Sequence, residues 1–145
     1  MATVAQLLQI KGHGVWTIGP NATMYAALEL MAAKDIGALL VVESEKVVGI
    51  LTERDYARKV ALYGKTSQTA LVNEVMTKEI VYISPNRTIE ECMTIMTKRH
   101  FRHLPVVENG KLAGIVSIGD VVKFIIEDQD FLIHELEKYI VGTRG

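Results

Sequence analysis

The sequence has few of the features that mark secreted, membrane-spanning or nucleic-acid-binding proteins. Its only cysteine is Cys92, so no disulfide can form within the chain. The 16 basic and 17 acidic residues give a formal net charge of −1, without the basic excess that binds nucleic acids or acidic membranes. No basic leader precedes an apolar run, and the longest apolar run, residues 36–42, is too short to span a bilayer. We therefore expect a cytoplasmic protein that binds neither nucleic acid nor membrane.

Catalytic and metal-binding patterns are also missing from the sequence. Neither a G-x-G-x-x-G nor a Walker phosphate loop occurs. No nucleophile stands beside a base, and no carboxylate pair suggests acid–base chemistry. His100 and His103 are three residues apart, but no cysteine or acidic cluster supplies the further ligands that a metal needs. The sequence therefore favours a binding protein over an enzyme, and we expect no metal requirement.

The sequence does contain a duplication. When the chain is shifted by 65 residues, residues 15–60 align with residues 80–125 without a gap, and 13 of the 46 pairs are identical. Composition alone gives roughly three identities. The identities cluster at Pro-Asn-x-Thr, Val-Val-Glu and Gly-Ile, and Asp55 aligns with Asp120. The chain therefore contains one structural unit twice.

Both copies predict the same order of elements, β-α-β-β-α, and hence an α+β fold. A short apolar strand runs into a Pro-Asn turn, after which Thr23 or Thr88 is a typical helix N-cap. Two strands joined by a polar turn follow, and a second helix begins near Arg54 or Gly119. The predicted strands are 15–18, 38–42 and 47–51 in the first copy and 80–83, 104–107 and 112–116 in the second.

Three helices are predicted outside the duplicated elements, at residues 4–8, 71–76 and 130–141. The last follows an acidic boundary and is amphipathic, with the apolar stripe Leu132, Leu136, Tyr139 and Ile140. This stripe can pack on the protein's own core or on a second subunit. We divide the chain into residues 1–66, with the first helix and first repeat, and residues 67–145, with the connector, second repeat and last helix.

The third strand of each copy runs into a hydroxyl residue with an aspartate three positions later, in Thr52-Glu53-Arg54-Asp55 and Ser117-Ile118-Gly119-Asp120. One interpretation is a helix cap, in which both side chains satisfy free backbone N–H groups. The other is a ligand site, because helix N-termini attract anions and arginine binds phosphate through two hydrogen bonds. The ligand site is favoured by the nearby side chains of Arg54, Arg102 and His103. It is also favoured because the usual acid of a capping box is the longer glutamate, whereas both motifs have aspartate.

Together these motifs resemble a tandem pair of CBS domains, also called a Bateman module. The first is similar to the "TERD" form of small stand-alone bacterial pairs, and Arg102-His103-Leu104-Pro105-Val106 resembles the second-strand signature of the family. The resemblance covers about residues 15–126 and implies repeats packed about a pseudo-twofold axis, with two clefts for adenosine-containing ligands. It also implies a regulatory homodimer that binds AMP, ADP, ATP, S-adenosylmethionine or NAD.

In such a cleft, the hydroxyl and helix amides suit a phosphate, the aspartate suits a ribose diol, and an apolar wall suits the base. The sites are unequal, because Gly119 stands where the first repeat has Arg54, and the second motif needs a cation such as Arg102 or His103. The first motif is therefore the stronger candidate. The expected ligand-binding residues are Thr17, Ile18, Gly37, Ala38, Leu39, Thr52, Arg54 and Asp55, and in the second repeat Tyr82, Ile83, Arg102, His103, Leu104, Pro105, Ser117, Gly119 and Asp120.

The expected function is regulation. An adenine nucleotide, either AMP, ADP or ATP or the dinucleotide NAD, binds between the repeats and changes the conformation or assembly of the protein, which an effector protein then detects. The alternative is a ligand-free scaffold that acts through dimerisation, with Thr52 and Ser117 serving only as helix caps.

Overall fold

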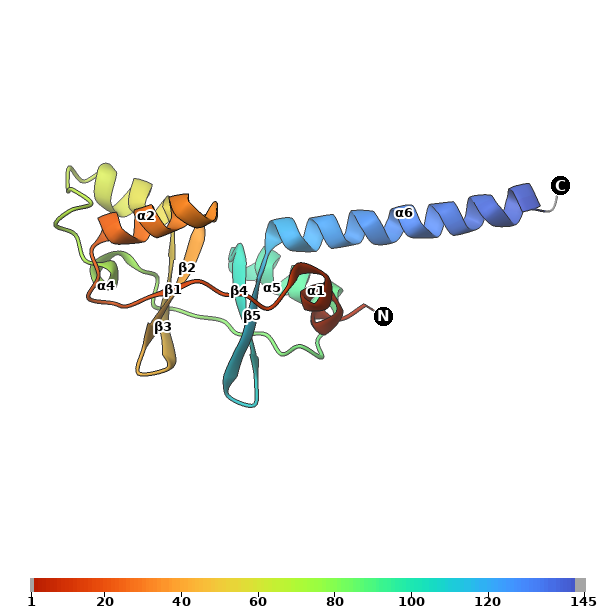
Figure 1. The fold of residues 1–145 in the computed structure, drawn as a ribbon, viewed down its shortest axis with the longest axis horizontal. Helices are drawn as coiled ribbons and strands as arrows, with labels where there is room; N and C mark the ends of the chain where they lie inside the picture. The colour runs from red at the N-terminus through yellow and green to blue at the C-terminus, as the bar shows by residue number, and fades with distance from the viewer. Residues whose placement is uncertain (1, 143–145) are drawn as a thin grey trace. The chain divides into compact units, whose positions relative to one another are not determined.

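The chain folds into two units, one for each repeat. The computed structural model describes residues 2–142, except the side chains of residues 130–132, 135 and 139–142. One unit is Gly14–Tyr82, and the other combines Met1–His13 with Ile83–Gly145. Figure 1 shows the elements of both units. The N-terminal segment therefore belongs to the second repeat, whereas the sequence-based division at residue 66 groups it with the first.

The unit Gly14–Tyr82 is a three-stranded sheet covered by helices (Figure 1). Strand β1 pairs in parallel with β2, which pairs antiparallel with β3. The buried core includes Met24 and Met31 from α2, Leu39 from β2 and Leu51 from β3. The elements are β1 (Thr17–Ile18), α2 (Met24–Lys34), β2 (Ala38–Glu43), β3 (Lys46–Thr52), α3 (Glu53–Tyr56), the π-helix η1 (Ala57–Ala61) and α4 (Val72–Val75).

The second unit repeats this plan around the antiparallel pair β4–β5. The first strand of the repeat is reduced to one parallel bridge, Ile83 to Val106. Its elements are α5 (Ile89–Arg99), β4 (His103–Glu108), β5 (Lys111–Ser117) and α6 (Ile118–Gly142).

The N-terminal helix α1 (Val4–Lys11) completes this second unit. The backbone N–H of Val4 donates to the carbonyl of Arg87 at 2.9 Å, and Leu8 is fully buried. A Cβ atom on Gly114 would lie 2.9 Å from Leu8 Cδ2, so glycine at this position of β5 lets the helix approach the strand.

The duplication extends to backbone details. Thr23 and Thr88 cap α2 and α5 as predicted, each accepting a hydrogen bond through its side chain. Both helices end at a left-handed residue, Asp35 with φ 53° and His100 with φ 58°. Both hairpins carry the same register irregularity, after Val41 and after Val106. The predicted β-α-β-β-α order is therefore confirmed as an α+β fold.

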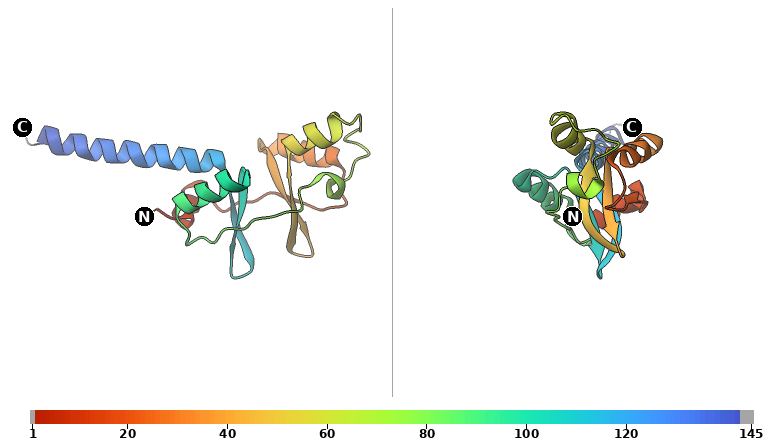
Figure 2. Two further views of the ribbon diagram at one scale, coloured as in Figure 1. Left: turned by 180° about the vertical axis from the view of Figure 1, so that it is seen from behind. Right: turned by 90° about the vertical axis from the view of Figure 1, so that its left-hand side faces the viewer.

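The C-terminal region differs from its prediction. Instead of a helix over 130–141 behind a boundary, α6 is a single helix from Ile118 to Gly142, seen unbroken in the left view of Figure 2. The acidic run at 127–130 does not end the helix, because no glycine or proline interrupts it there. The side chains of Leu132, Tyr139 and Ile140 lie outside the described residues. Of the helices within the described part, none is long and apolar enough to cross a membrane.

Candidate functional site

The junction between β3 and α3 is a closed hydrogen-bonded ring formed by Thr52 and Asp55. The Thr52 hydroxyl oxygen accepts from the Asp55 N–H at 3.1 Å. In return, Asp55 Oδ2 accepts from the Thr52 N–H at 3.0 Å and from the Thr52 hydroxyl at 3.1 Å. This is a reciprocal capping box, with the threonine at the N-cap and the aspartate at N3.

The other oxygen of Asp55 ties the connector between the repeats to this junction. Asp55 Oδ1 accepts from the Thr77 hydroxyl at 3.3 Å and lies 3.1 Å from the Lys59 ammonium. Lys59 also donates to the carbonyl of Val75 at 3.0 Å. A carboxylate has about four acceptor positions, and four donors already occupy those of Asp55. The side chain is nearly buried, at 12% exposure, and has no free acceptor for a ligand.

The junction between β5 and α6 has the same ring but a different partner. Asp120 Oδ2 accepts from the Ser117 N–H at 2.9 Å, and the Asp120 N–H donates to the Ser117 hydroxyl at 3.0 Å. The ammonium of Lys11, from α1, lies 2.6 Å from the same Oδ2 and donates to the Ile115 carbonyl at 2.5 Å. Within the described part of the chain, no hydrogen bond or ion pair reaches Asp120 Oδ1.

Both rings show that aspartate can complete a reciprocal capping box. The usual acid of this box is the longer glutamate, and the presence of aspartate therefore favoured a ligand site over a cap in the sequence. In both junctions the shorter acid reaches the N-cap N–H, at 3.0 Å from Asp55 and 2.9 Å from Asp120. The choice of aspartate therefore does not distinguish a ligand site from a cap.

The charges around the second junction shift the pKa values of two side chains. Burial raises the pKa of Asp120, but hydrogen bonds from Lys11 and the Ser117 N–H outweigh it, and the net pKa lies below the ordinary value. Burial lowers the pKa of His103, and the positive charge of Lys11 lowers it further against the opposing charge of Asp120. Asp120 is therefore a stable anion beside a neutral imidazole at neutral pH.

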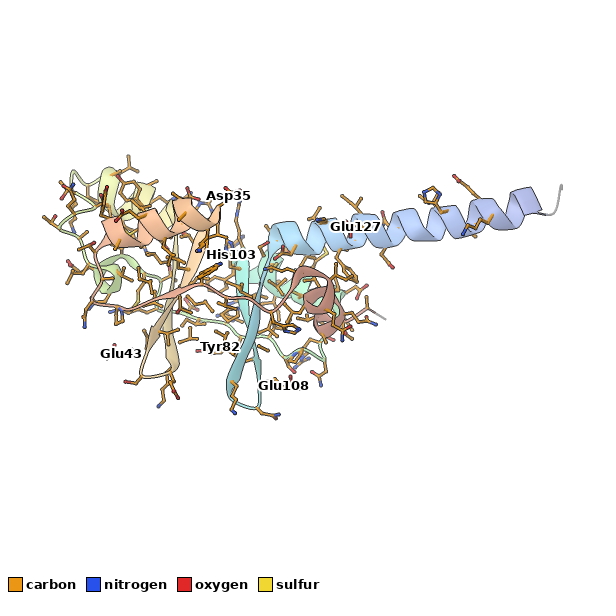
Figure 3. All side chains as sticks on the ribbon, viewed as in Figure 1. Asp35, Glu43, Tyr82, His103, Glu108 and Glu127 are labelled. Carbon is orange, nitrogen blue, oxygen red and sulfur yellow. The ribbon has the colours of Figure 1, made fainter. Side chains whose placement is uncertain are left out.

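Strand pairing brings the start of the second strand to each junction. Ala38 pairs with Thr52, and the Gly37 carbonyl accepts from the Glu53 N–H at 3.1 Å. In the second unit His103 pairs with Ser117, and the Arg102 carbonyl accepts from the Ile118 N–H at 2.8 Å. Figure 3 shows His103 at this end of β4 and Glu108 at the opposite, turn end.

The predicted cations and the glycine of the second motif are accessible. Arg54 and Arg102 are exposed, and neither side chain has a hydrogen bond or ion pair to any described residue. Gly119 is also exposed, and a Cβ atom there would lie 3.6 Å from Ser117 Oγ, at ordinary van der Waals distance. Each junction therefore combines a helix N-terminus with a nearby arginine that has no protein partner in the described part.

Several residues of the predicted apolar wall face the core instead. Leu39 and Leu104 have no exposed surface, and Ile83 has 3%. Pro105 is also buried, and Ile18 packs against the core of its unit. A base cannot lie against Leu39 or Leu104 unless the core opens, because inward positions of a strand point away from solvent.

Two further predicted residues lie on the surface. Thr17 is exposed in β1. Tyr82 is exposed as well, and its hydroxyl donates to the Val47 carbonyl of β3 at 3.3 Å. The Tyr82 hydroxyl is therefore already engaged within its own unit.

The sequence did not indicate three residues of the junctions. Lys59 is four residues after Asp55, a spacing typical of helical ion pairs, and this pair could have been found. Thr77 and Lys11 lie 22 and over 100 residues from their aspartates, so local patterns do not reveal them. Lys11 places a positive charge beside Asp120, in addition to the exposed Arg102.

Two hollows lie near the junctions. One, of about 340 Å³, is lined by Glu53, Gly37, Asp35 and apolar residues of α2 and its end. The other, of about 240 Å³, lies between α1 and α6 and is lined by Leu7, Ile10, Lys11, Asp120, Lys123, Phe124 and Glu127.

Among the described residues, no group of three or more histidine, cysteine or acidic side chains could hold a metal. Burial raises the pKa of the Cys92 thiol to about 11, so this thiol is not a nucleophile at neutral pH.

A comparison with models of known protein families finds the same duplication as the fold and the two junctions. The family model described as the CBS domain matches residues 9–62 and again residues 72–127. The chain therefore belongs to the CBS-domain family, and it carries the domain as a tandem pair. Proteins with such pairs are regulatory or signal-transduction modules.

Three similar proteins illustrate the range of the family. A solved structure of a CBS-domain protein from Burkholderia ambifaria, assigned to signal transduction, is 48% identical, with a TM-score of 0.85, and the match covers 88% of this chain and 96% of that one. The mitochondrial CBS domain-containing protein CBSX3 of Arabidopsis thaliana is 34% identical, over 97% of this chain and 72% of its own. A hexameric CBS-CP12 protein from bloom-forming cyanobacteria is 28% identical, with a TM-score of 0.76, over 99% and 84%.

Proposed function

We propose that this protein is a regulatory module that binds an adenosine-containing nucleotide at its strand–helix junctions. The proposal is supported by the repeated geometry of these junctions, where a helix N-terminus, an arginine without a protein partner and a hydroxyl–aspartate pair occur in both units. The positive end of the helix dipole suits a phosphate, and a carboxylate suits a ribose diol. The chain's membership of a regulatory family agrees with this function.

The second junction is the better candidate for the ribose, contrary to the ranking by sequence. Asp55 accepts from four donors, whereas Asp120 uses Oδ2 and keeps Oδ1 without a partner among the described residues. The side chain of Asp120 is also more exposed, at 26% against 12%. Lys11 provides a cation next to it that can face a phosphate.

Binding would act by changing conformation or assembly, which an effector protein outside this chain detects. A ligand shifts such an equilibrium only through its different affinities for the two states, typically by about 1–3 kcal/mol. The hexameric relative assembles from chains similar to this one, and we propose that this protein also associates with copies of itself. AMP, ADP, ATP and NAD remain the candidate ligands.

The proposal is tested by isothermal titration of nucleotide-free protein with AMP, ADP, ATP, NAD and S-adenosylmethionine. We expect micromolar binding of at least one ligand, and at least tenfold weaker binding in Asp120→Ala, because a hydrogen bond to a charged group contributes about 1.5–3 kcal/mol. Asp128→Ala is the matched control, since Asp128 is an exposed aspartate on the same helix. Absence of binding across the panel would overturn the nucleotide proposal, and unchanged affinity in Asp120→Ala would overturn the site.

A ligand-free scaffold is the second candidate, and one observation favours it. Both aspartates already complete capping boxes, and a cap contributes about 1 kcal/mol of stability without any ligand. Native mass spectrometry of the purified protein distinguishes the two functions. Bound adenylate supports the nucleotide-binding function. Its absence, together with titrations in which no nucleotide binds, supports the scaffold function.

A further inference from the structure

The hollow between α1 and α6 adjoins the carboxylate that we propose as the ribose ligand. Asp120 belongs to its lining, together with Lys11, whose ammonium lies 2.6 Å from Asp120 Oδ2. The volume of the hollow is about 240 Å³. Asp120 Oδ1 has no hydrogen bond or ion pair within the described part of the chain. A ribose bound to this oxygen can therefore direct one of its two substituents, the base or the phosphate, into the hollow.

Apolar side chains of both helices also line the hollow. Leu7 and Ile10 line it from α1, and Phe124 lines it from α6. Ile10 is 70% exposed and Phe124 is half-buried, so both offer apolar surface to a ligand. Aromatic and aliphatic side chains on two sides are the surroundings in which proteins hold a planar base. The hollow therefore offers the base a surface that the buried Leu39 and Leu104 do not.

Two charged side chains complete the lining. Lys123 and Glu127 are exposed on α6, and neither has a hydrogen bond or ion pair to a described residue. The ammonium of Lys123 donates hydrogen bonds, and the carboxylate of Glu127 accepts them. The edge of adenine needs both, because its 6-amino group donates and the neighbouring ring nitrogen accepts. A phosphate in the hollow would instead meet the negative charge of Glu127, so the lining suits the base better than the phosphate.

The spacing of the two acids on α6 suits an adenosine. Glu127 lies on α6 (Figure 3), seven residues after Asp120. The two acids therefore share one face of the helix within about 20° and are separated by about 10 Å along its axis. This separation is comparable with the length of adenosine from its ribose hydroxyls to its 6-amino group.

We propose that the hollow between α1 and α6 holds the adenine base of a nucleotide whose ribose is bound by Asp120. The base lies between Ile10 and Phe124, and its 6-amino group donates to Glu127. The phosphate then lies outside the hollow, at the N-terminus of α6, beside the exposed Arg102. This inference rests on the proposed function and assigns the side chains that bind the base at the second junction.

Titration of the full chain with two ligands tests the contact of Glu127. The ligands are AMP, whose adenosine is common to all the candidate nucleotides, and purine riboside 5′-monophosphate, which lacks only the 6-amino group. We expect Glu127→Ala to weaken AMP binding at least fivefold, because a hydrogen bond to a charged group is lost, and to leave binding of the analogue unchanged. Asp128→Ala is the matched control, since Asp128 is an exposed acid on the same helix outside the lining of the hollow.

Methyl NMR of the unmodified chain locates the base without any substitution. The ring current of a bound adenine should shift the methyl signals of Ile10 when AMP is added. Ile126, which is 52% exposed on α6 but does not line the hollow, should keep its signals. The variant Ile10→Ser should weaken AMP binding several-fold, because the base loses apolar contact, whereas Ile126→Ser should bind AMP as the unmodified chain does.

The outcomes separate this inference from the function on which it rests. If AMP binds and Asp120→Ala weakens it, but Glu127→Ala and the Ile10 signals show no effect, the base lies elsewhere and only this inference fails. If Glu127→Ala weakens AMP and the analogue equally, the carboxylate does not contact the 6-amino group, and the assignment of the base is wrong. If no nucleotide binds, the proposed function fails and this inference fails with it.

Discussion

Asp55 and Asp120 occupy equivalent positions, but their surroundings give them different roles. Asp55 holds its own helix cap and, through Thr77 and Lys59, the connector that follows the first repeat. Asp120 holds its cap and the N-terminal helix through Lys11. A sequence alignment of the repeats treats the two residues as identical. The contacts differ, because all acceptor positions of Asp55 are occupied, whereas Asp120 Oδ1 has no partner among the described residues.

Replacement of Asp55 by alanine is expected to destabilise the protein more than replacement of Asp120. Asp55→Ala removes a cap, the acceptor of the Thr77 hydroxyl and the ion pair of Lys59, which keeps its bond to the Val75 carbonyl, and we expect a loss of about 2–4 kcal/mol. Asp120→Ala removes a cap and a more exposed ion pair, about 1–2 kcal/mol. Urea unfolding followed by circular dichroism measures both. Glu53→Ala, an exposed acid beside Asp55, is the control, and equal losses in the two aspartate variants would contradict the contact pattern.

His103 is expected to make the stability of the protein depend on pH below the ordinary imidazole pKa of 6.5. Its folded-state pKa lies below the ordinary value of 6.5, because of burial, Lys11 and Arg102, with Asp120 opposing. The unfolded chain therefore takes up the proton first, and stability falls as the pH decreases through 6.5. His103→Gln should flatten this part of the stability curve, measured by thermal unfolding at several pH values.

Asp120 contributes a separate change at lower pH. Its folded-state pKa is also below the ordinary value, so its contribution is present above about pH 4 and is lost on further acidification.

His134→Gln, at an exposed histidine, is the control for the His103 experiment. A curve that is equally steep in His103→Gln and in the unmodified protein would show that His103 is not the titrating group.

The two hairpins show how the same element tolerates different sequences. Both have two-residue turns with positive φ, 50° at Ser44 and 66° at Glu45 in the first, and 53° at Asn109 and 76° at Gly110 in the second. Asn-Gly suits this type of turn, whereas Ser-Glu does not. The second hairpin was therefore predictable from its turn, and the first only from its alignment with the second.

Glu45→Gly is expected to stabilise the protein by about 0.5–1 kcal/mol, because glycine adopts positive φ without the steric cost that a Cβ atom brings. The reverse change, Gly110→Ala, should destabilise the second hairpin by a similar amount. Chemical denaturation of both variants gives the two values. A neutral or destabilising effect of Glu45→Gly would show that the turn in solution differs from the one described here.

Local signals predicted the helices and strands within each repeat better than the helix at the end. Thr23 and Thr88 mark helix starts through their own side chains, and the continuous apolar runs of β2 and β4 mark buried strands. The continuous helix α6 was divided in the prediction, because its acidic middle resembles a solvated boundary. A helix can pass through such a run when no residue there breaks the backbone pattern.

At the scale of the whole molecule, the association of distant segments was the least predictable feature. The helix α1, which ends at Lys11, packs on β5 and α6, which begin only at Lys111 and Ile118. Composition and periodicity describe each segment but not which segments meet. The candidate site was therefore predicted as far as its motif residues, while Lys11, which reaches it from α1, was not.

Lys11→Met is expected to loosen α1 from the second unit. The ammonium of Lys11 joins Asp120 and the Ile115 carbonyl, and methionine keeps the aliphatic packing while removing both interactions. Because the pair is partly exposed, we expect a loss of about 1 kcal/mol in global stability. The local effect should be larger, with faster amide hydrogen exchange in Val4–Lys11 than elsewhere in the unit.

Lys123→Met is the matched control, since Lys123 lines the same hollow between α1 and α6. It should leave exchange in α1 unchanged, because none of its side-chain contacts within the described part fixes that helix. In Lys11→Met, the pKa of Asp120 should rise, as burial then acts with less opposition, and carbon-detected NMR titration measures this shift. If α1 exchanges at the same rate in Lys11→Met and in the unmodified protein, the apolar contact of Leu8 with Gly114 alone holds the helix in place.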